Sequence, residues 1–179
     1  MKRYIWILFL FSIMFCLGFS DYNSPRKRPF GTEADVTFAN DAWQAIEGYE
    51  DWLIKSDYYE GQKPHGEILR TYFSIIHING NSYHTIVKDN FGGKDADVET
   101  VSKNPDKYLK VVTIMVKRED GYDPDNNNWF WVKYSAGGEI LKNDKGMALA
   151  GRVAKGMNTG CIACHSGAEG NDYVFFNDK

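Results

Sequence analysis

The chain has 179 residues, of which 43% are hydrophobic and 25% are charged, and its formal net charge is −3. This length suits one domain with a single hydrophobic core. The slightly acidic balance argues against nucleic acid or an anionic membrane surface as a partner.

The first 20 residues have the features of a secretory signal peptide. Lys2 and Arg3 form a short basic segment, residues 4–17 are apolar, and small residues favour cleavage after Ser20. The apolar run is shorter than the roughly 20 residues of a membrane-spanning helix, so an uncleaved anchor is the less favoured alternative. A lipoprotein signal at Cys16 is another. The protein is therefore expected to be exported, for example to the periplasm, with a mature net charge of −5.

The segment after the signal peptide, residues 21–39, is expected to be a linker because it holds a short basic run between two prolines. Residues 40–179, which come after this linker, are expected to form a single domain. Its first element is predicted to be a helix over residues 40–56, because apolar residues recur there at helical spacing. Asn40 or Asp41 is expected to be the N-cap.

Four segments rich in β-branched and aromatic residues are predicted to be strands, namely residues 68–78, 83–89, 108–118 and 129–134. Asparagine, glycine and proline lie between them, as is typical of turns. A helix of small residues over 146–157 is then expected to lead the chain to its C-terminal motif. The order of elements indicates an α+β fold.

That motif is Cys161-Ile162-Ala163-Cys164-His165, a C-x-x-C-H sequence that is typical of covalent haem c attachment. Two thiols three residues apart can bond to the two vinyl groups of a haem, and the adjacent imidazole can bind the iron. A redox dithiol usually follows a strand in a βαβ unit, and a closed zinc site needs four ligands, so both alternatives are less favoured. Haem c is attached outside the cytoplasm, which agrees with the predicted signal peptide.

The late position of the motif limits the choice of a sixth iron ligand. Small electron-transfer cytochromes usually have a methionine ligand downstream of the motif, but the 14 residues after His165 contain neither Met nor His. Four-helix cytochromes c′ have a late motif and an open iron, but the predicted strands do not fit a helical bundle. The remaining candidates lie upstream: His65, His77, His84, Met147 and Met157.

Several motifs together resemble those of the cytochrome P-460 family. They are residues 145–157 and Asp172-Tyr173-Val174-Phe175 around the C-x-x-C-H sequence, Asp123-Pro124-Asp125, Pro64-His65-Gly66, and Ile86-Val87-Lys88-Asp89-Asn90. The resemblance covers about residues 41–178. It implies a mainly antiparallel β-sheet with flanking helices, often in a homodimer, and one haem c packed on the sheet with an open distal side. An open iron favours structural roles for the upstream histidines and methionines.

The resemblance also implies roles for two strand residues. In the P-460 family a lysine amine is bonded to a meso carbon of the porphyrin, and Lys88 matches this lysine; a lysine at a strand edge is the alternative. Arg70 matches a family arginine, which can pair with a haem propionate or donate to an iron-bound ligand, unless it forms a surface salt bridge. Strand alternation places Asn90 on the face of Lys88 and turns Asp89 away from it. Which face of the Arg70 strand meets the haem stays open.

Two functions are compatible with this resemblance. In the first, the protein is an enzyme that oxidises hydroxylamine or a related small nitrogen species and passes the electrons to an external acceptor such as another cytochrome. In the second, the iron binds nitric oxide or carbon monoxide without turnover, as in the relatives called cytochrome c′-beta, which lack the lysine cross-link. Plain electron carriage is less favoured because a downstream sixth ligand is missing.

Overall fold

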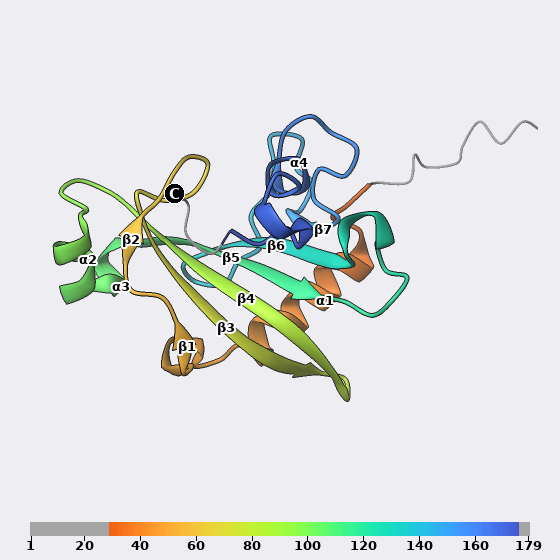
Figure 1. Ribbon diagram of the computed structural model, residues 1–179, viewed down its shortest axis with the longest axis horizontal. Helices are drawn as coiled ribbons and strands as arrows, with labels where there is room; N and C mark the ends of the chain where they lie inside the picture. The colour runs from red at the N-terminus through yellow and green to blue at the C-terminus, as the bar shows by residue number, and fades with distance from the viewer. Residues whose placement is uncertain (1–28, 176–179) are drawn as a thin grey trace, which may run out of the picture.

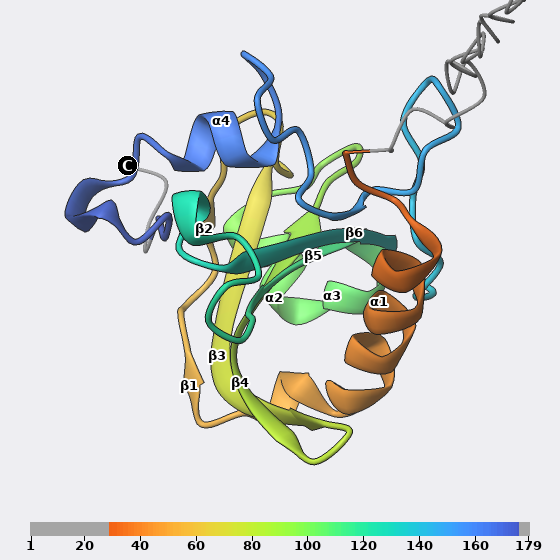
Figure 2. The ribbon, with the colours of Figure 1, turned by 90° about the vertical axis from the view of Figure 1, so that its right-hand side faces the viewer.

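The computed structural model of the protein describes residues 29–175, so the predicted signal peptide and residues 21–28 of the predicted linker lie outside the described part. An antiparallel β-sheet forms the centre. Helix α1 (Glu33–Ala45) lies against one side of it, and the C-terminal segment with α4 (Cys161–His165) lies on another (Figure 1). The long strands curve around α1 (Figure 2). Among the described residues, no helix is long and apolar enough to cross a membrane.

The seven-stranded sheet has the order β1-β3-β4-β5-β6-β7, and β2 also pairs with β3. All of these pairings are antiparallel. The strands are β1 (Ile54–Lys55), β2 (Tyr59–Glu60), β3 (Ile68–Ile78), β4 (Asn81–Phe91), β5 (Leu109–Lys117), β6 (Trp129–Ser135) and β7 (Ala150–Gly151). The short helices are η1 (Tyr49–Asp51), α2 (Val98–Lys103), α3 (Pro105–Tyr108), η2 (Pro124–Asn126) and η3 (Glu169–Asn171).

The four long strands confirm the four strands predicted from the sequence, and their ends differ by at most two residues. The mainly antiparallel α+β fold is confirmed as well. Long runs of β-branched and aromatic residues are the reason, because such side chains pack well on both faces of a pleated sheet.

The first helix begins earlier than predicted. Thr32 is its N-cap, because the Thr32 hydroxyl accepts a hydrogen bond from the amide of Asp35 at 3.2 Å, and the Asp35 carboxylate accepts one from the amide of Thr32 at 3.0 Å. This capping box satisfies two amides at the start of α1. The predicted helix over residues 40–56 with an N-cap at Asn40 or Asp41 is therefore wrong, and α1 begins inside the segment expected to be a linker.

The second predicted helix, over residues 146–157, is not formed. The chain instead makes turns around the short strand β7. Gly146, Gly151 and Gly156 have φ angles of 73°, 100° and 72°, which are incompatible with a right-handed helix. A Cβ atom on Gly151 would lie 2.5 Å from the carboxyl carbon of Asp35. The small residues therefore allow β7 to approach α1 closely, and their spacing does not reflect a helix.

The sheet has a buried core on each face. The core between α1 and the sheet combines residues from the helix and its C-cap with residues from the strands: Ala39, Ala42, Ile46, Tyr72, Val87, Val112, Phe130 and Tyr134. The opposite face packs against the C-terminal segment through a second cluster: Ile86, Met115, Trp129, Trp131, Val153 and Ile162. Side-chain alternation along β4, β5 and β6 produces this division.

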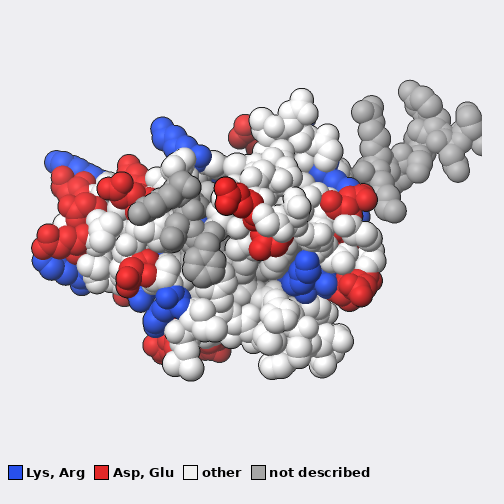
Figure 3. Space-filling model, viewed as in Figure 1, with Lys and Arg blue, Asp and Glu red and all other residues white. Residues whose placement is uncertain are grey.

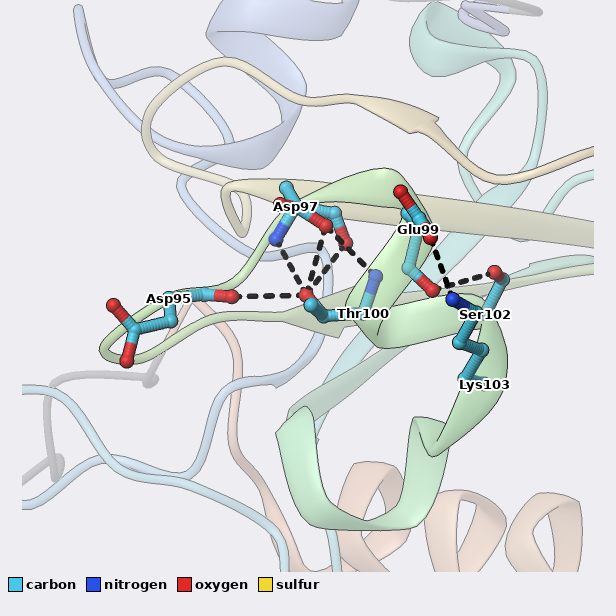
Figure 4. Close-up of polar contacts among 6 residues, drawn as sticks. All are labelled: Asp95, Asp97, Glu99, Thr100, Ser102 and Lys103. Atoms are coloured by element: carbon cyan, nitrogen blue, oxygen red, sulfur yellow. Dashed lines mark hydrogen bonds and ion pairs between the residues drawn. The ribbon is translucent and has the colours of Figure 1, made fainter.

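The connection between β4 and β5 contains α2. It lies at an end of the molecule where acidic and basic side chains gather (Figure 3). Asp97 is the N-cap of α2, and its carboxylate accepts a hydrogen bond from the amide of Thr100 at 2.7 Å (Figure 4). This hydrogen bond lowers the pKa of Asp97. Lys103 pairs with Glu99 one turn earlier, at 2.5 Å. These contacts stabilise a short helix with local interactions.

A buried carboxylate connects η1, β3 and β4 on the α1 face. Asp89 is 3% exposed, and it accepts hydrogen bonds from the hydroxyls of Tyr49 at 2.6 Å and Tyr72 at 3.2 Å. Burial raises the pKa of Asp89 to about 6, although both hydrogen bonds act in the opposite direction. Burial likewise raises the pKa of both tyrosines, so their hydroxyls remain donors.

The Asp89→Asn variant should have a different dependence of stability on pH. The pKa of Asp89 is raised from 3.8 in the unfolded chain to about 6 in the folded protein, so the folded state favours the proton. Its contribution to stability is therefore greatest below pH 4 and falls as the pH rises to about 6, by about 3 kcal/mol for such a shift. Urea unfolding of both proteins between pH 4 and pH 7.5 measures this loss as a difference in slope. Parallel curves for the two proteins would contradict the assignment.

Candidate haem-binding site

The C-x-x-C-H motif lies beside a largely apolar cavity on the face of the sheet opposite α1. Strands β4, β5 and β6 form one wall, and the segment around α4 forms another (Figures 1 and 2). The loop over residues 61–66, which connects β2 to β3, closes a third side with Pro64 and His65. The lining residues include Ile86, Lys88, Thr113, Met115, Trp131, Leu149, Val153, Val174 and Phe175.

Cys161 and Cys164 line this cavity, and both are free thiols. They lie one turn apart in α4, which starts after Gly160. A Cβ atom on Gly160 would lie 2.4 Å from the Cβ of Ala154, so glycine is needed where the chain enters the helix. Burial raises the pKa of the Cys161 thiol, and the nearby Lys133 ammonium lowers it by a smaller amount. Two thiols on one wall of the cavity can bond to both vinyl groups of a single haem.

His165 ends α4 and is 8% exposed. Its Nδ1 lies 2.7 Å from the carbonyl oxygen of Tyr173. A carbonyl oxygen can only accept, so Nδ1 carries the proton and donates, and the lone pair is on Nε2. The rings of Trp131 and Phe175 contact the imidazole with centroid distances of 4.7 Å and 5.3 Å. The histidine is therefore held in the tautomer and orientation typical of a metal ligand.

The segment that supplies the Tyr173 carbonyl is attached to the connection between β5 and β6. The indole of Trp129, the first residue of β6, donates a hydrogen bond to the carbonyl of Asp172 at 2.7 Å. Before α4, Lys155 forms an ion pair with the buried carboxylate of Asp123. Both sides of the motif are thus fixed to the same connection, which stabilises the orientation of His165.

Lys88 lies in the cavity wall at the middle of β4, and it is only 6% exposed. Its cross-strand partner on β5 is Thr113, which also lines the cavity. Burial of an ammonium group is unfavourable without a specific environment, so a buried lysine beside a cavity is a candidate for a functional group. Ile86 lines the cavity as well, whereas Asp89 lies among the tyrosines on the α1 face. This agrees with the predicted alternation along the strand.

Arg70 is not beside the cavity. It pairs with Asp89 across β3 and β4, and directly opposite residues share one face of a sheet, so Arg70 lies on the face opposite Lys88. Its Nε donates to the carbonyl of Ser56 at 3.2 Å, and its Nη1 donates to the hydroxyl of Tyr58 at 3.2 Å. The guanidinium also stacks on the Tyr58 ring at 4.6 Å. These contacts hold Arg70 against the segment that precedes β3, away from the cavity, and they do not favour the expected contact with a haem propionate or an iron-bound ligand, which stays a prediction.

Among the described histidines upstream of the motif, His65 is the one that lines the cavity. Its ring centroid lies 6.0 Å from that of His165. His77 is exposed and contacts Ser82 near the turn between β3 and β4, and His84 is exposed as well. In the sequence, the family-like motif Pro64-His65-Gly66 indicated His65 as a candidate. The structure shows that His65 belongs to the cavity wall.

The described residues that line the cavity include no Asp or Glu. The ionisable groups there are two lysines, two cysteines and two histidines: Lys88, Lys133, Cys161, Cys164, His65 and His165. The remaining walls are mostly apolar. Such a lining suits the porphyrin ring, and the donor set of two thiols and one imidazole matches the chemistry of haem c.

The cytochrome P-460 family model matches residues 46–176. No curated protein and no solved structure gives a significant match. The matched range includes η1, strands β1 to β7 and the C-x-x-C-H motif, and it favours haem over the dithiol and zinc alternatives. Because the match extends over both the sheet and the motif, the chain belongs to the cytochrome P-460 family and is a haem c cytochrome.

Proposed function

We propose that the protein oxidises hydroxylamine, or a related small nitrogen species, at a haem c whose porphyrin is covalently bonded to Lys88. The position of Lys88 carries this proposal. It is a buried lysine in the wall of the same cavity that Cys161, Cys164 and His165 line. In the family, a lysine bonded to a meso carbon of the porphyrin distinguishes cytochromes P-460 from their gas-binding relatives.

Cys161 and Cys164 would hold the haem as thioethers, and Nε2 of His165 would bind the iron. The haem would supply a redox-active iron for the oxidation of a small molecule. The hydrogen bond from Nδ1 of His165 to the Tyr173 carbonyl makes the imidazole a stronger donor to the metal. Trp131 packs against the imidazole and prevents its rotation. These contacts fix the orientation of the His165 imidazole before any substrate enters.

Lys88 would bond the porphyrin to the centre of β4, in addition to the two thioethers from α4. Formation of this C–N bond would replace a porphyrin C–H bond and an amine N–H bond, with two electrons passing to an oxidant such as a peroxide. An attachment on a second wall would restrict the macrocycle and tune its reduction potential. The apolar walls around it admit small neutral molecules, and hydroxylamine is neutral near pH 7. The electrons would pass to an external acceptor such as another cytochrome. The features of residues 1–20 and the chemistry of haem c support a site of action outside the cytoplasm.

Binding of nitric oxide or carbon monoxide without turnover is a second candidate. The observation that favours it is the absence of Asp and Glu among the described residues of the cavity wall. Oxidation of hydroxylamine releases protons, whereas capture of a diatomic gas requires no proton acceptor. Ile86, Met115 and Trp131 provide apolar walls suited to such ligands.

The Lys88→Leu variant should lose the cross-link and keep the two thioethers, because leucine fills the cavity wall but has no amine. In the wild type, we expect a strongly red-shifted Soret band for the ferrous protein and a tryptic peptide in which Lys88 is bonded to the haem. Both signals should disappear in the variant. Lys133→Leu is the matched control, because Lys133 is the other lysine of the cavity and its replacement should preserve both signals. An ordinary c-type spectrum of the wild type would reject the cross-link.

Turnover separates the two functions. With a soluble electron acceptor, the wild type should oxidise hydroxylamine, and Lys88→Leu should lower kcat by about tenfold or more, equivalent to about 1.4 kcal/mol in the barrier. Lys133→Leu should retain most of the wild-type rate. A wild type that binds nitric oxide but does not oxidise hydroxylamine supports the gas-binding function. Full turnover by Lys88→Leu would remove the role proposed for Lys88.

A further inference from the structure

Asn90 is a buried amide, 4% exposed, that lies two residues after Lys88 on β4. Its Nδ2 donates to the carbonyl of Lys88 at 2.8 Å and to the hydroxyl of Thr113 at 3.3 Å. Its Oδ1 accepts from the amide of Gly66 at 3.1 Å and from Nδ1 of His65 at 3.0 Å. Both ends of the side chain are therefore engaged, with two hydrogen bonds each.

These hydrogen bonds connect two walls of the cavity, the sheet and the loop. Lys88 belongs to β4, Thr113 to β5, and His65 to the loop over residues 61–66, and all three line the cavity. The Thr113 hydroxyl also donates to the Lys88 carbonyl at 3.2 Å, which closes a small network with Asn90. Asn90 itself does not line the cavity, so it acts on the cavity through the residues that it holds.

The loop is built to meet Asn90. A Cβ atom on Gly66 would lie 2.6 Å from the carbonyl oxygen of Phe91 and 2.9 Å from the carbonyl carbon of Asn90, so only glycine allows this approach. The pairing of β4 with β5 shifts register between Asn90 and Phe91, at the same place. Gly66 thus presents its amide to the Asn90 side chain, and the preceding residue, His65, lies in the cavity wall.

We infer that Asn90 is a positioning residue of the haem site, which holds His65 at the cavity and fixes the Lys88 segment of β4 against β5. An apolar side chain of similar size leaves the Gly66 amide and one His65 nitrogen without this acceptor. The loop is then free to move away from β4. The inference rests on the proposed function in so far as the Lys88 cross-link is one of its readouts.

Two variants separate the two halves of the network. Asn90→Leu removes all four hydrogen bonds, whereas Asn90→Asp keeps the acceptors for Gly66 and His65 and loses the two donors. The matched control is Thr85→Val, because the buried Thr85 hydroxyl makes a similar bond on the same strand, to the carbonyl of Tyr83 at 3.1 Å, and Thr85 does not line the haem cavity. All proteins are prepared with haem attached and compared by thermal unfolding.

Two measurements on these proteins test the inference. Mass spectrometry gives the fraction of chains in which Lys88 is bonded to the haem, and amide hydrogen exchange gives the protection of residues 61–66. We expect Asn90→Leu to lose cross-link severalfold and to exchange faster in the loop. Asn90→Asp should keep the loop protected and lose part of the cross-link. Thr85→Val should match the wild type in both measurements, even if its unfolding temperature falls.

The outcomes separate this inference from the proposed function. A cross-linked wild type with an equally cross-linked and equally protected Asn90→Leu variant would overturn the inference and leave the proposed function intact. A wild type without the cross-link would reject the proposed function, and the exchange of residues 61–66 would then decide the inference alone. If Asn90→Leu does not fold with haem, unchanged cross-linking in Asn90→Asp together with loss of loop protection would overturn it.

Discussion

Strand β4 is buried on both of its faces, and this burial fixes where the residues of the core and of the cavity lie. Every residue from Thr85 to Phe91 is buried, and alternate side chains enter two different environments. Val87 and Asp89 face α1, whereas Lys88 lines the cavity beside the C-x-x-C-H motif. A shift of one residue in the register would move the lysine into the hydrophobic core and the carboxylate to the haem. The hydrogen bonds from Tyr49 and Tyr72 to Asp89 oppose such a shift.

The orientation of His165 depends on contacts that are distant in the sequence. The C-x-x-C-H motif brings the thiols and the imidazole together through one turn of helix, but the tautomer of the imidazole depends on the Tyr173 carbonyl. The segment that carries this carbonyl is held at the start of β6, where the indole of Trp129 donates to the neighbouring carbonyl of Asp172. The central strands of the sheet therefore serve as one wall of the cavity and as a support of the His165 side chain.

The long strands were predictable because each carries its own signal, a run of β-branched and aromatic residues. The helices were not, because their limits depend on single residues and on neighbours. Thr32 and Asp35 start α1 earlier than the apolar spacing alone indicates. The small residues of the segment 146–157 recur at a helix-like spacing. Gly151, however, has a positive φ and lies close to the carboxylate of Asp35, which requires a strand beside α1. The face of Arg70 was also undetermined, since alternation defines two faces but does not say which one meets the haem.

The haem c motif, the family resemblance, the four long strands and the candidate Lys88 could be predicted from the sequence, because each of these is contained in a short segment or in a motif of fixed spacing. The folded chain was needed to show that Lys88 shares a cavity with Cys161 and His165, that Arg70 lies on the opposite face, and that His65 lies in the cavity wall where Asn90 holds its loop. These relations depend on strand pairing, because the cavity lies between segments that are distant in the chain and meet only when the sheet forms.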